Sequence, residues 1–206
     1  MIKDSERSEY FDENDYDYNA SSKTGIMLIH GFSSTTYEFK KLAKFLSERN
    51  IFVRFENLPG HGTTVDDCNS YQYMDWIKFV EMRFADMASR CDRIYVLGIS
   101  MGALLAMHLS VLFPVNGLIA AAPILKFNKP FKVHILNRLF CRVVQYRSKK
   151  YEFHPSQQKC YGYNKWPLIS LNEVRKLSNY VSKDIVSKIS CPSLFIHSKM
   201  DYTSIY

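Results

Sequence analysis

The 206-residue sequence predicts a single domain of the α/β class, with a mostly parallel sheet and helices on both faces. Three observations lead to this fold class. Short apolar segments alternate with segments of helical spacing, which is typical of β-α-β units. A glycine-flanked serine, Ser100, stands between one such strand and the helix after it. Residues 124–180 interrupt the alternation, so we expect them to form a helical cap inserted into the domain.

The predicted elements follow one another from an acidic beginning. Residues 1–17 carry seven acids and two bases, so residues 1–24 are expected to be a flexible acidic leader with a short strand near Tyr10-Phe11. Thr35 and Glu38 have the spacing of a capping box, which predicts a helix from Thr36. Core strands are expected at 25–29, 51–55, 93–97, 118–122 and 192–197, and helices at about 36–46, 72–89 and 103–109. The core thus comprises 25–123 and 181–206.

The cap segment 124–180 is strongly basic, with twelve bases and two acids. Apolar residues within 131–146 share one face at helical spacing: Leu136, Leu139, Phe140, Val143 and Val144. One interpretation is an amphipathic cap that packs this face on the core and leaves its bases in water. The alternative is a surface that attracts anionic or membrane-borne substrates, giving transient contact with a membrane surface.

Composition excludes several other classes of protein. Residues 1–20 are polar and do not resemble a signal peptide, and polar residues with Pro114 interrupt the apolar run 101–125, which favours a helix-turn-strand over a membrane span. Five cysteines are scattered without C-x-x-C spacing, so we expect a cytoplasmic protein without disulfides, metal or cofactor. The net charge is +7, but no nucleic-acid-binding motif is present, and we expect no nucleic-acid partner. The oligomeric state is not predicted.

The most informative motif is Gly98-Ile99-Ser100-Met101-Gly102. A G-x-S-x-G sequence between a strand and a helix is a nucleophile elbow, in which the serine takes a positive φ and projects from the sheet. Glycine at both flanking positions avoids clashes with the neighbouring strand and helix. His30-Gly31-Phe32, the 58–62 loop, Pro123 and Asp201 also follow predicted strands, where the ligand site of a parallel sheet lies.

With these motifs placed, residues 25–206 resemble the α/β-hydrolase family of bacterial carboxylesterases and monoglyceride lipases. The resemblance rests on Leu28-Ile29-His30-Gly31-Phe32, Pro59-Gly60-His61-Gly62, Gly98-Ile99-Ser100-Met101-Gly102 and Ser198-Lys199-Met200-Asp201. It implies hydrolysis of carboxylic esters, such as short or medium acyl esters or monoacylglycerols, through an acyl-enzyme on Ser100.

The resemblance also assigns roles to individual residues. It implies that Ser100 is the nucleophile, that the backbone N–H groups of Phe32 and Met101 form the oxyanion hole, and that Asp201 orients a catalytic histidine. His30 and His61 are expected to be structural, and His108 to be a hydrogen-bonded helix residue. Apolar cap residues suggest a small hydrophobic ester as the substrate: Phe127, Phe131, Leu136, Phe140 and Trp166.

The family's catalytic histidine follows a further strand beyond the acid, whereas Asp201 lies five residues before Tyr206. The sequence therefore predicts a fold truncated before its last strand and helix, an exposed edge at 192–197, and weak or absent activity of the 206-residue form. His134, His154 and His197 remain as replacement bases. Two other functions stay open: a non-catalytic binding protein of the same fold, and a serine peptidase or thioesterase.

Overall fold

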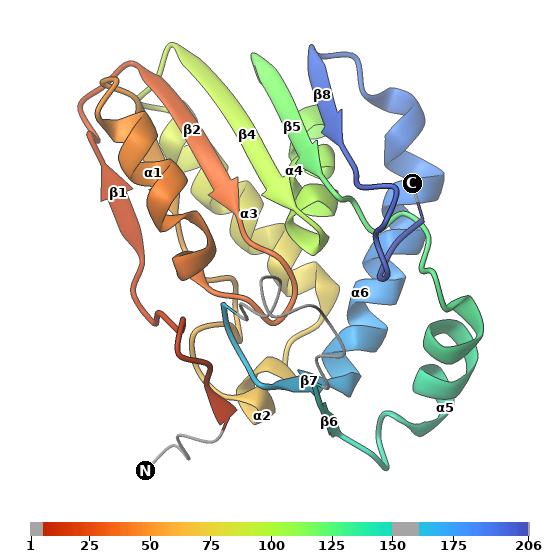
Figure 1. Cartoon of the computed structure of the whole chain (residues 1–206). Helices are drawn as coiled ribbons and strands as arrows, with labels where there is room; N and C mark the ends of the chain where they lie inside the picture. The colour runs from red at the N-terminus through yellow and green to blue at the C-terminus, as the bar shows by residue number, and fades with distance from the viewer. Residues whose placement is uncertain (1–5, 150–160, 206) are drawn as a thin grey trace.

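The computed structural model describes residues 6–149 and 161–205, and its centre is a six-stranded sheet (Figure 1). The strand order is β1-β3-β2-β4-β5-β8, and every pair from β3 to β8 is parallel, whereas β1 is antiparallel to β3. The strands are β1 Tyr16–Tyr18, β2 Thr24–Ile29, β3 Phe52–Phe55, β4 Arg93–Ile99, β5 Gly117–Ala121 and β8 Ser193–Ile196. This confirms the predicted mostly parallel sheet and its five core strands.

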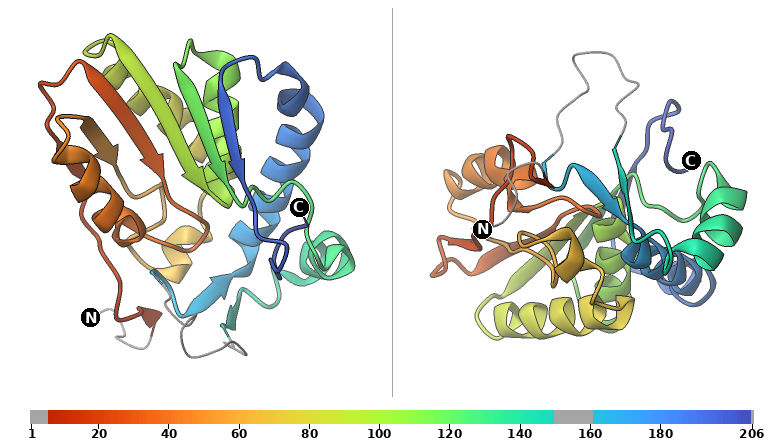
Figure 2. Two further views of the ribbon diagram at one scale, coloured as in Figure 1. Left: turned by 45° about the horizontal axis from the view of Figure 1, so that its top comes forward. Right: turned by 90° about the horizontal axis from the view of Figure 1, so that it is seen from below.

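Helices cover both faces of the sheet, as predicted (Figure 2). One face holds α1, Lys40–Ser47, which follows the 3₁₀ turn Thr36–Phe39. The other face holds α3 (Tyr73–Ala88), α4 (Met101–Leu112) and α6 (Leu168–Tyr180). The period-2 alternation of β2 divides the core accordingly. Ile26 and Leu28 pack with α1, whereas Met27 and Ile29 join the larger cluster beneath α3, α4 and α6.

The elbow helix α4 is buried on almost every side, because the first ten of its residues are shielded from solvent. A helix enclosed in this way is apolar all round, which explains the long apolar run in the sequence. Among the described residues, no helix combines the length and apolarity needed to cross a membrane.

The first strand differs from the sequence prediction. It lies at Tyr16–Tyr18 and not near Tyr10-Phe11, and it forms an edge of the sheet inside the segment expected to be a flexible leader. Side-chain contacts to β3 hold it there, and the acidic composition of the segment does not indicate them. Tyr16 stacks on Phe55 with ring centroids 4.8 Å apart, and Asp17 forms a bidentate ion pair with Arg54.

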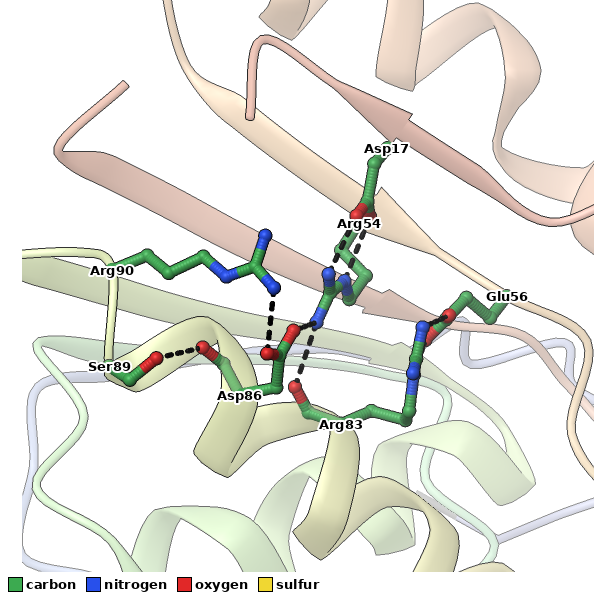
Figure 3. Close-up of polar contacts among 7 residues, drawn as sticks. All are labelled: Asp17, Arg54, Glu56, Arg83, Asp86, Ser89 and Arg90. Carbon is green, nitrogen blue, oxygen red and sulfur yellow. Dashed lines mark hydrogen bonds and ion pairs between the residues drawn. The ribbon is translucent and has the colours of Figure 1, made fainter. Parts of the chain in front are cut away.

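Arg54 is a buried cation that joins three elements (Figure 3). Its Nε and Nη2 donate to the two carboxylate oxygens of Asp17 at 2.8 and 2.6 Å, and its Nη1 donates to Asp86 Oδ2 at 2.7 Å. Nη1 also donates to the backbone carbonyl of Arg83. The hydrogen bonds to Asp17 and Asp86 raise the pKa of Arg54 above its usual value, so the side chain stays charged. The network fastens β1 and α3 to β3.

Removing this cation is expected to destabilise the domain strongly. Arg54→Met would leave two carboxylates of the network without their buried partner, at a cost of about 3 kcal/mol in the free energy of unfolding. Urea denaturation measures this change. Arg90→Ala is the matched control, because Arg90 contacts the same Asp86 from an exposed position, where a pair contributes less than about 1 kcal/mol. Equal effects of the two substitutions would contradict the role given to Arg54.

The helix after β2 begins differently from the prediction. Thr35 precedes the helical turn, but its side chain makes no capping hydrogen bond, and its Oγ1 donates to the carbonyl of Tyr161. The Glu38 carboxylate instead accepts from the Gly31 N–H at 2.9 Å. The predicted capping box is therefore wrong, because both side chains are used in contacts to other loops.

The cap segment also departs from the prediction. It contains the helical stretch Lys132–Phe140, but also an antiparallel pair, β6 (Tyr146–Ser148) with β7 (Lys165–Pro167), where we expected no strand. Helix α6 lies within the predicted cap, yet Val174 and Leu177 belong to the main core. The apolar face of 131–144 points outward, so its expected packing on the core is wrong. Strand β8 is an exposed edge, as predicted, with half-exposed Leu194, Phe195 and Ile196.

Candidate active site

Ser100 occupies a sharp turn between β4 and α4. Its φ is +59° and its ψ is −113°, which confirms the predicted positive φ. The turn is tight enough to exclude any side chain at its flanks: a Cβ at Gly98 would lie 2.1 Å from the Gly102 carbonyl oxygen, and one at Gly102 would lie 2.0 Å from that of Ile29. The Ser100 N–H donates to the Ala121 carbonyl at 2.8 Å, which ties the turn to β5. The fold therefore holds this backbone in a strained conformation.

The loop after β2 lies directly against this turn. A Cβ placed on Gly31 would stand 3.4 Å from Ser100 Cβ, so the two backbones are in van der Waals range. Glu38 Oε2 accepts from the Gly31 N–H and fixes the loop. Burial is the largest influence on the Glu38 carboxyl and raises its pKa, opposed by that hydrogen bond. The loop thus reaches the serine through a defined contact.

Two backbone N–H groups at this junction are available to a ligand. Met101 is the first residue of α4, where a helical N–H has no acceptor within its own helix. The Phe32 N–H likewise donates to no acceptor among the described residues. A helix N-terminus also carries partial positive charge, which favours a negative oxygen there. The two residues predicted for an oxyanion hole are therefore sequence neighbours of the two backbones that meet here, since Met101 follows Ser100 and Phe32 follows Gly31.

The His30 and His61 rings are neighbours, with ring centroids 4.9 Å apart. His30 Nε2 accepts from the Leu58 N–H at 3.0 Å, and its Nδ1 lies 2.8 Å from the Gly31 carbonyl oxygen, so the neutral Nδ1–H tautomer satisfies both contacts. Burial lowers the pKa of His30 to about 4 and lowers that of His61 well below its usual value. The expectation of structural roles agrees with these contacts, because the hydrogen bonds of both rings among the described residues go to backbone groups of neighbouring loops.

These neutral histidines predict a loss of stability in mild acid. At His30 the unfolded chain binds a proton near pH 6.5 and the folded chain only near pH 4, so the stability from this residue is present above the unfolded pKa and declines as the pH falls. For His30 alone the free energy of unfolding should drop by about 2 kcal/mol between pH 7 and pH 5, and His61 acts in the same direction. Urea denaturation at the two pH values measures it. A His30→Gln variant should show a flatter profile, and an unchanged wild-type stability would contradict the assignment.

Aromatic side chains pack around Phe32. The Phe32 ring stacks on the Trp166 ring of β7, with ring centroids 6.0 Å apart and an angle of 16° between the ring planes. The His61 ring meets Phe32 edge-on. Lys149 Nζ lies 4.3 Å from the centre of the Trp166 ring. The other cap residues that we expected at a hydrophobic substrate site lie elsewhere: Phe127 is buried in the core, and Phe131, Leu136 and Phe140 are exposed.

Asp201 follows β8 at the carboxyl end of the sheet, but its contacts are local. Its Oδ2 lies 3.3 Å from His197 Nε2 and accepts from the Ser204 hydroxyl at 3.1 Å. The structure does not bring Asp201 or any described histidine into hydrogen-bonding contact with Ser100. His134 packs edge-on against Phe127, and His154 lies outside the described residues. His108 is hydrogen-bonded, to Glu81 and to Tyr180, as predicted.

Trp166 is the one of the five expected cap residues that packs on Phe32, whereas Glu38 and Tyr163 contact the loops near Ser100 without having been predicted there. Tyr163 is fully buried, and its N–H donates to the Ser33 carbonyl while its hydroxyl donates to that of Gly60. These contacts bridge more than a hundred residues of sequence, so no local spacing could have indicated them. No cluster of potential metal ligands occurs among the described residues.

Comparisons with known proteins agree with this geometry. The family model described as serine aminopeptidase, S33 matches residues 20–203. A thermostable monoacylglycerol lipase of Bacillus sp. (strain H-257) is 32% identical over 93 residues, which are 45% of this chain and only 37% of the relative. A carboxylesterase of Bacillus subtilis (strain 168) is 20% identical over 182 residues, which cover 86% of this chain and 72% of the relative.

Solved structures show the same fold. A structure from a study of the metagenome-derived lipolytic enzymes LipS and LipT superposes with a TM-score of 0.82 and 20% identity, covering 99% of this chain and 80% of the other. The monoacylglycerol lipase of Paleococcus ferrophilus superposes with a TM-score of 0.71 and 16% identity, covering 93% and 79%. The chain therefore belongs to the serine aminopeptidase S33 family and has the α/β-hydrolase fold.

Proposed function

We propose that this chain carries the nucleophile and oxyanion hole of a serine hydrolase that cleaves carboxylic esters through an acyl-enzyme on Ser100. The observation that carries the proposal is the strained turn at Ser100, with a positive φ, at the point where α4 begins and the loop at Gly31 makes contact. Backbone strain of this kind is maintained only where the surrounding fold enforces it, and it concentrates at functional sites. The names of the two curated relatives, a lipase and a carboxylesterase, support the same class of reaction.

The proposed reaction has two steps. Ser100 Oγ attacks the acyl carbonyl, and the Phe32 and Met101 N–H groups stabilise the negative oxygen of the tetrahedral intermediate. The ester C–O bond then breaks, the alcohol leaves with a proton, and the acyl group remains on Ser100. Water attacks this acyl-enzyme and releases the acid. Asp201 is proposed to orient and charge-stabilise a histidine that accepts the Ser100 proton.

The proposed substrate is a small hydrophobic ester, such as a short or medium acyl ester or a monoacylglycerol. The stacked Phe32 and Trp166 rings supply an apolar wall beside the N–H groups, which suits an acyl chain. The basic cap suits a substrate collected at a membrane surface. Scattered cysteines without paired spacing favour the cytoplasm as the compartment.

Mass spectrometry after incubation with p-nitrophenyl acetate, butyrate and octanoate tests the proposal. We expect one acyl group on the peptide that contains Ser100, together with release of p-nitrophenol. Because both steps need a base, slow turnover would leave the adduct detectable. Absence of any adduct would favour the binding-protein alternative. Cleavage of an aminoacyl p-nitroanilide in preference to the esters would favour a peptidase, and preference for an acyl thioester would favour a thioesterase.

A further inference from the structure

The helical stretch Lys132–Phe140 and the turn after it contact the rest of the domain at a few described residues. Cys141 is buried, and Asn137 Nδ2 donates to the Leu168 carbonyl at 3.0 Å. The His134 ring packs edge-on against buried Phe127 at 5.8 Å. These contacts fix which side of the stretch faces the domain and which side faces solvent.

The solvent side carries large apolar side chains at helical spacing. We call this set the exposed cap face: Phe131, Ile135, Leu139, Phe140, Val143 and Val144. Val143 is 81% exposed, Phe131 65% and Leu139 64%. Single exposed apolar residues are ordinary on protein surfaces, but six within fourteen residues of one segment mark an interaction site.

The charge around this face selects the kind of partner. No acidic residue occurs between Ile124 and Lys149, whereas the same span contains seven lysines and arginines. Lys132 and Arg138 are exposed on the helical stretch itself, and Arg142 is exposed in the turn after it. Long basic side chains can extend from an apolar face to anionic headgroups while their methylene groups remain among apolar neighbours.

The location fits a role in reaching substrate. Figure 1 shows α5 (Arg138–Phe140), the end of this stretch, at the end of the molecule to which the core strands point. Ser100 follows β4 at that same end. Docking of the protein through the exposed cap face would therefore turn the carboxyl end of the sheet towards the membrane.

We infer that the exposed cap face is a membrane-docking surface that inserts into the interface of a bilayer containing anionic phospholipids. Its apolar side chains lie among the outer parts of the acyl chains, and its bases contact the headgroups. The docking itself is independent of catalysis, whereas delivery of membrane-borne esters to Ser100 rests on the proposed function. Vesicle binding therefore tests it separately from ester hydrolysis.

Flotation of the protein with phosphatidylcholine vesicles, with and without phosphatidylserine, measures the binding. We expect binding to vesicles with phosphatidylserine, weakened at least about tenfold by the combined substitutions Leu139→Ser, Phe140→Ser and Val143→Ser. Lys132→Gln with Arg142→Gln should reduce the preference for phosphatidylserine. Phe45→Ser with Met82→Ser is the matched control and should bind like the wild type, because these two side chains are as exposed but lie on other helices.

Two further readouts make the outcome decisive. A tryptophan introduced as Phe140→Trp should be quenched by lipids with brominated acyl chains, whereas adsorption by charge alone would leave it unquenched and overturn the inference. Size-exclusion chromatography compares oligomeric states. A wild-type dimer that the triple serine variant converts to a monomer would identify a second copy of the chain as the occupant and overturn it, as would absence of binding to either vesicle. Ser100→Ala should bind vesicles normally.

Discussion

Ser100→Ala is expected to abolish acyl transfer to the protein while leaving its fold unchanged. The substitution removes the hydroxyl and nothing else, and alanine has the same backbone preferences as serine at the observed φ of +59°. Without the Ser100 hydroxyl no acyl-enzyme can form at this position, whichever group accepts the proton. In the mass-spectrometric assay the adduct should disappear, and p-nitrophenol release should fall to the rate without protein.

A serine on the same helix supplies the control for this experiment. Ser110 is buried in α4, and its hydroxyl donates only to the Met107 carbonyl one turn earlier. Ser110→Ala should therefore retain the adduct, and both variants should keep the free energy of unfolding to within about 1 kcal/mol. An adduct that persists in Ser100→Ala and maps to another residue would refute the assignment of the nucleophile.

Gly98→Ala should cause a large loss of stability. The added Cβ would lie 2.1 Å from the Gly102 carbonyl oxygen and 2.5 Å from the Ala103 nitrogen. These are backbone atoms of the first turn of α4, which is enclosed on all sides and cannot move away without opening the core. We expect a loss of about 3 kcal/mol in the free energy of unfolding, measured by urea denaturation, with loss of acylation as the turn shifts.

Gly117→Ala is the matched control, because it adds the same methyl group to a central strand without the close contact to backbone atoms that exists at Gly98. Gly117 also belongs to a central strand, but a Cβ there would first meet the side chain of Tyr95, at 3.0 Å, and a ring can shift. We expect a change below about 1 kcal/mol. If the two alanine variants were equally stable, the elbow would not be as tightly packed as the distances indicate.

The sequence determined the class of fold and the position of the nucleophile, because both depend on local patterns. Apolar runs of strand length, separated by helical segments, predicted the parallel strands, and the glycines around Ser100 predicted its positive φ. These features rely on residues within one strand-turn-helix unit, so nearest-neighbour geometry is sufficient to specify them.

The tertiary structure alone decided which distant groups meet. Asp17 joins a sheet because Arg54 lies opposite it, and Glu38 holds Gly31 although its spacing from Thr35 indicated a cap. The amphipathic pattern of 131–146 was visible in the sequence, but periodicity gives only the relative positions of side chains around a helix. Whether the apolar face turns to the core or to solvent depends on the partner on its other side, which here is Leu168 with Phe127.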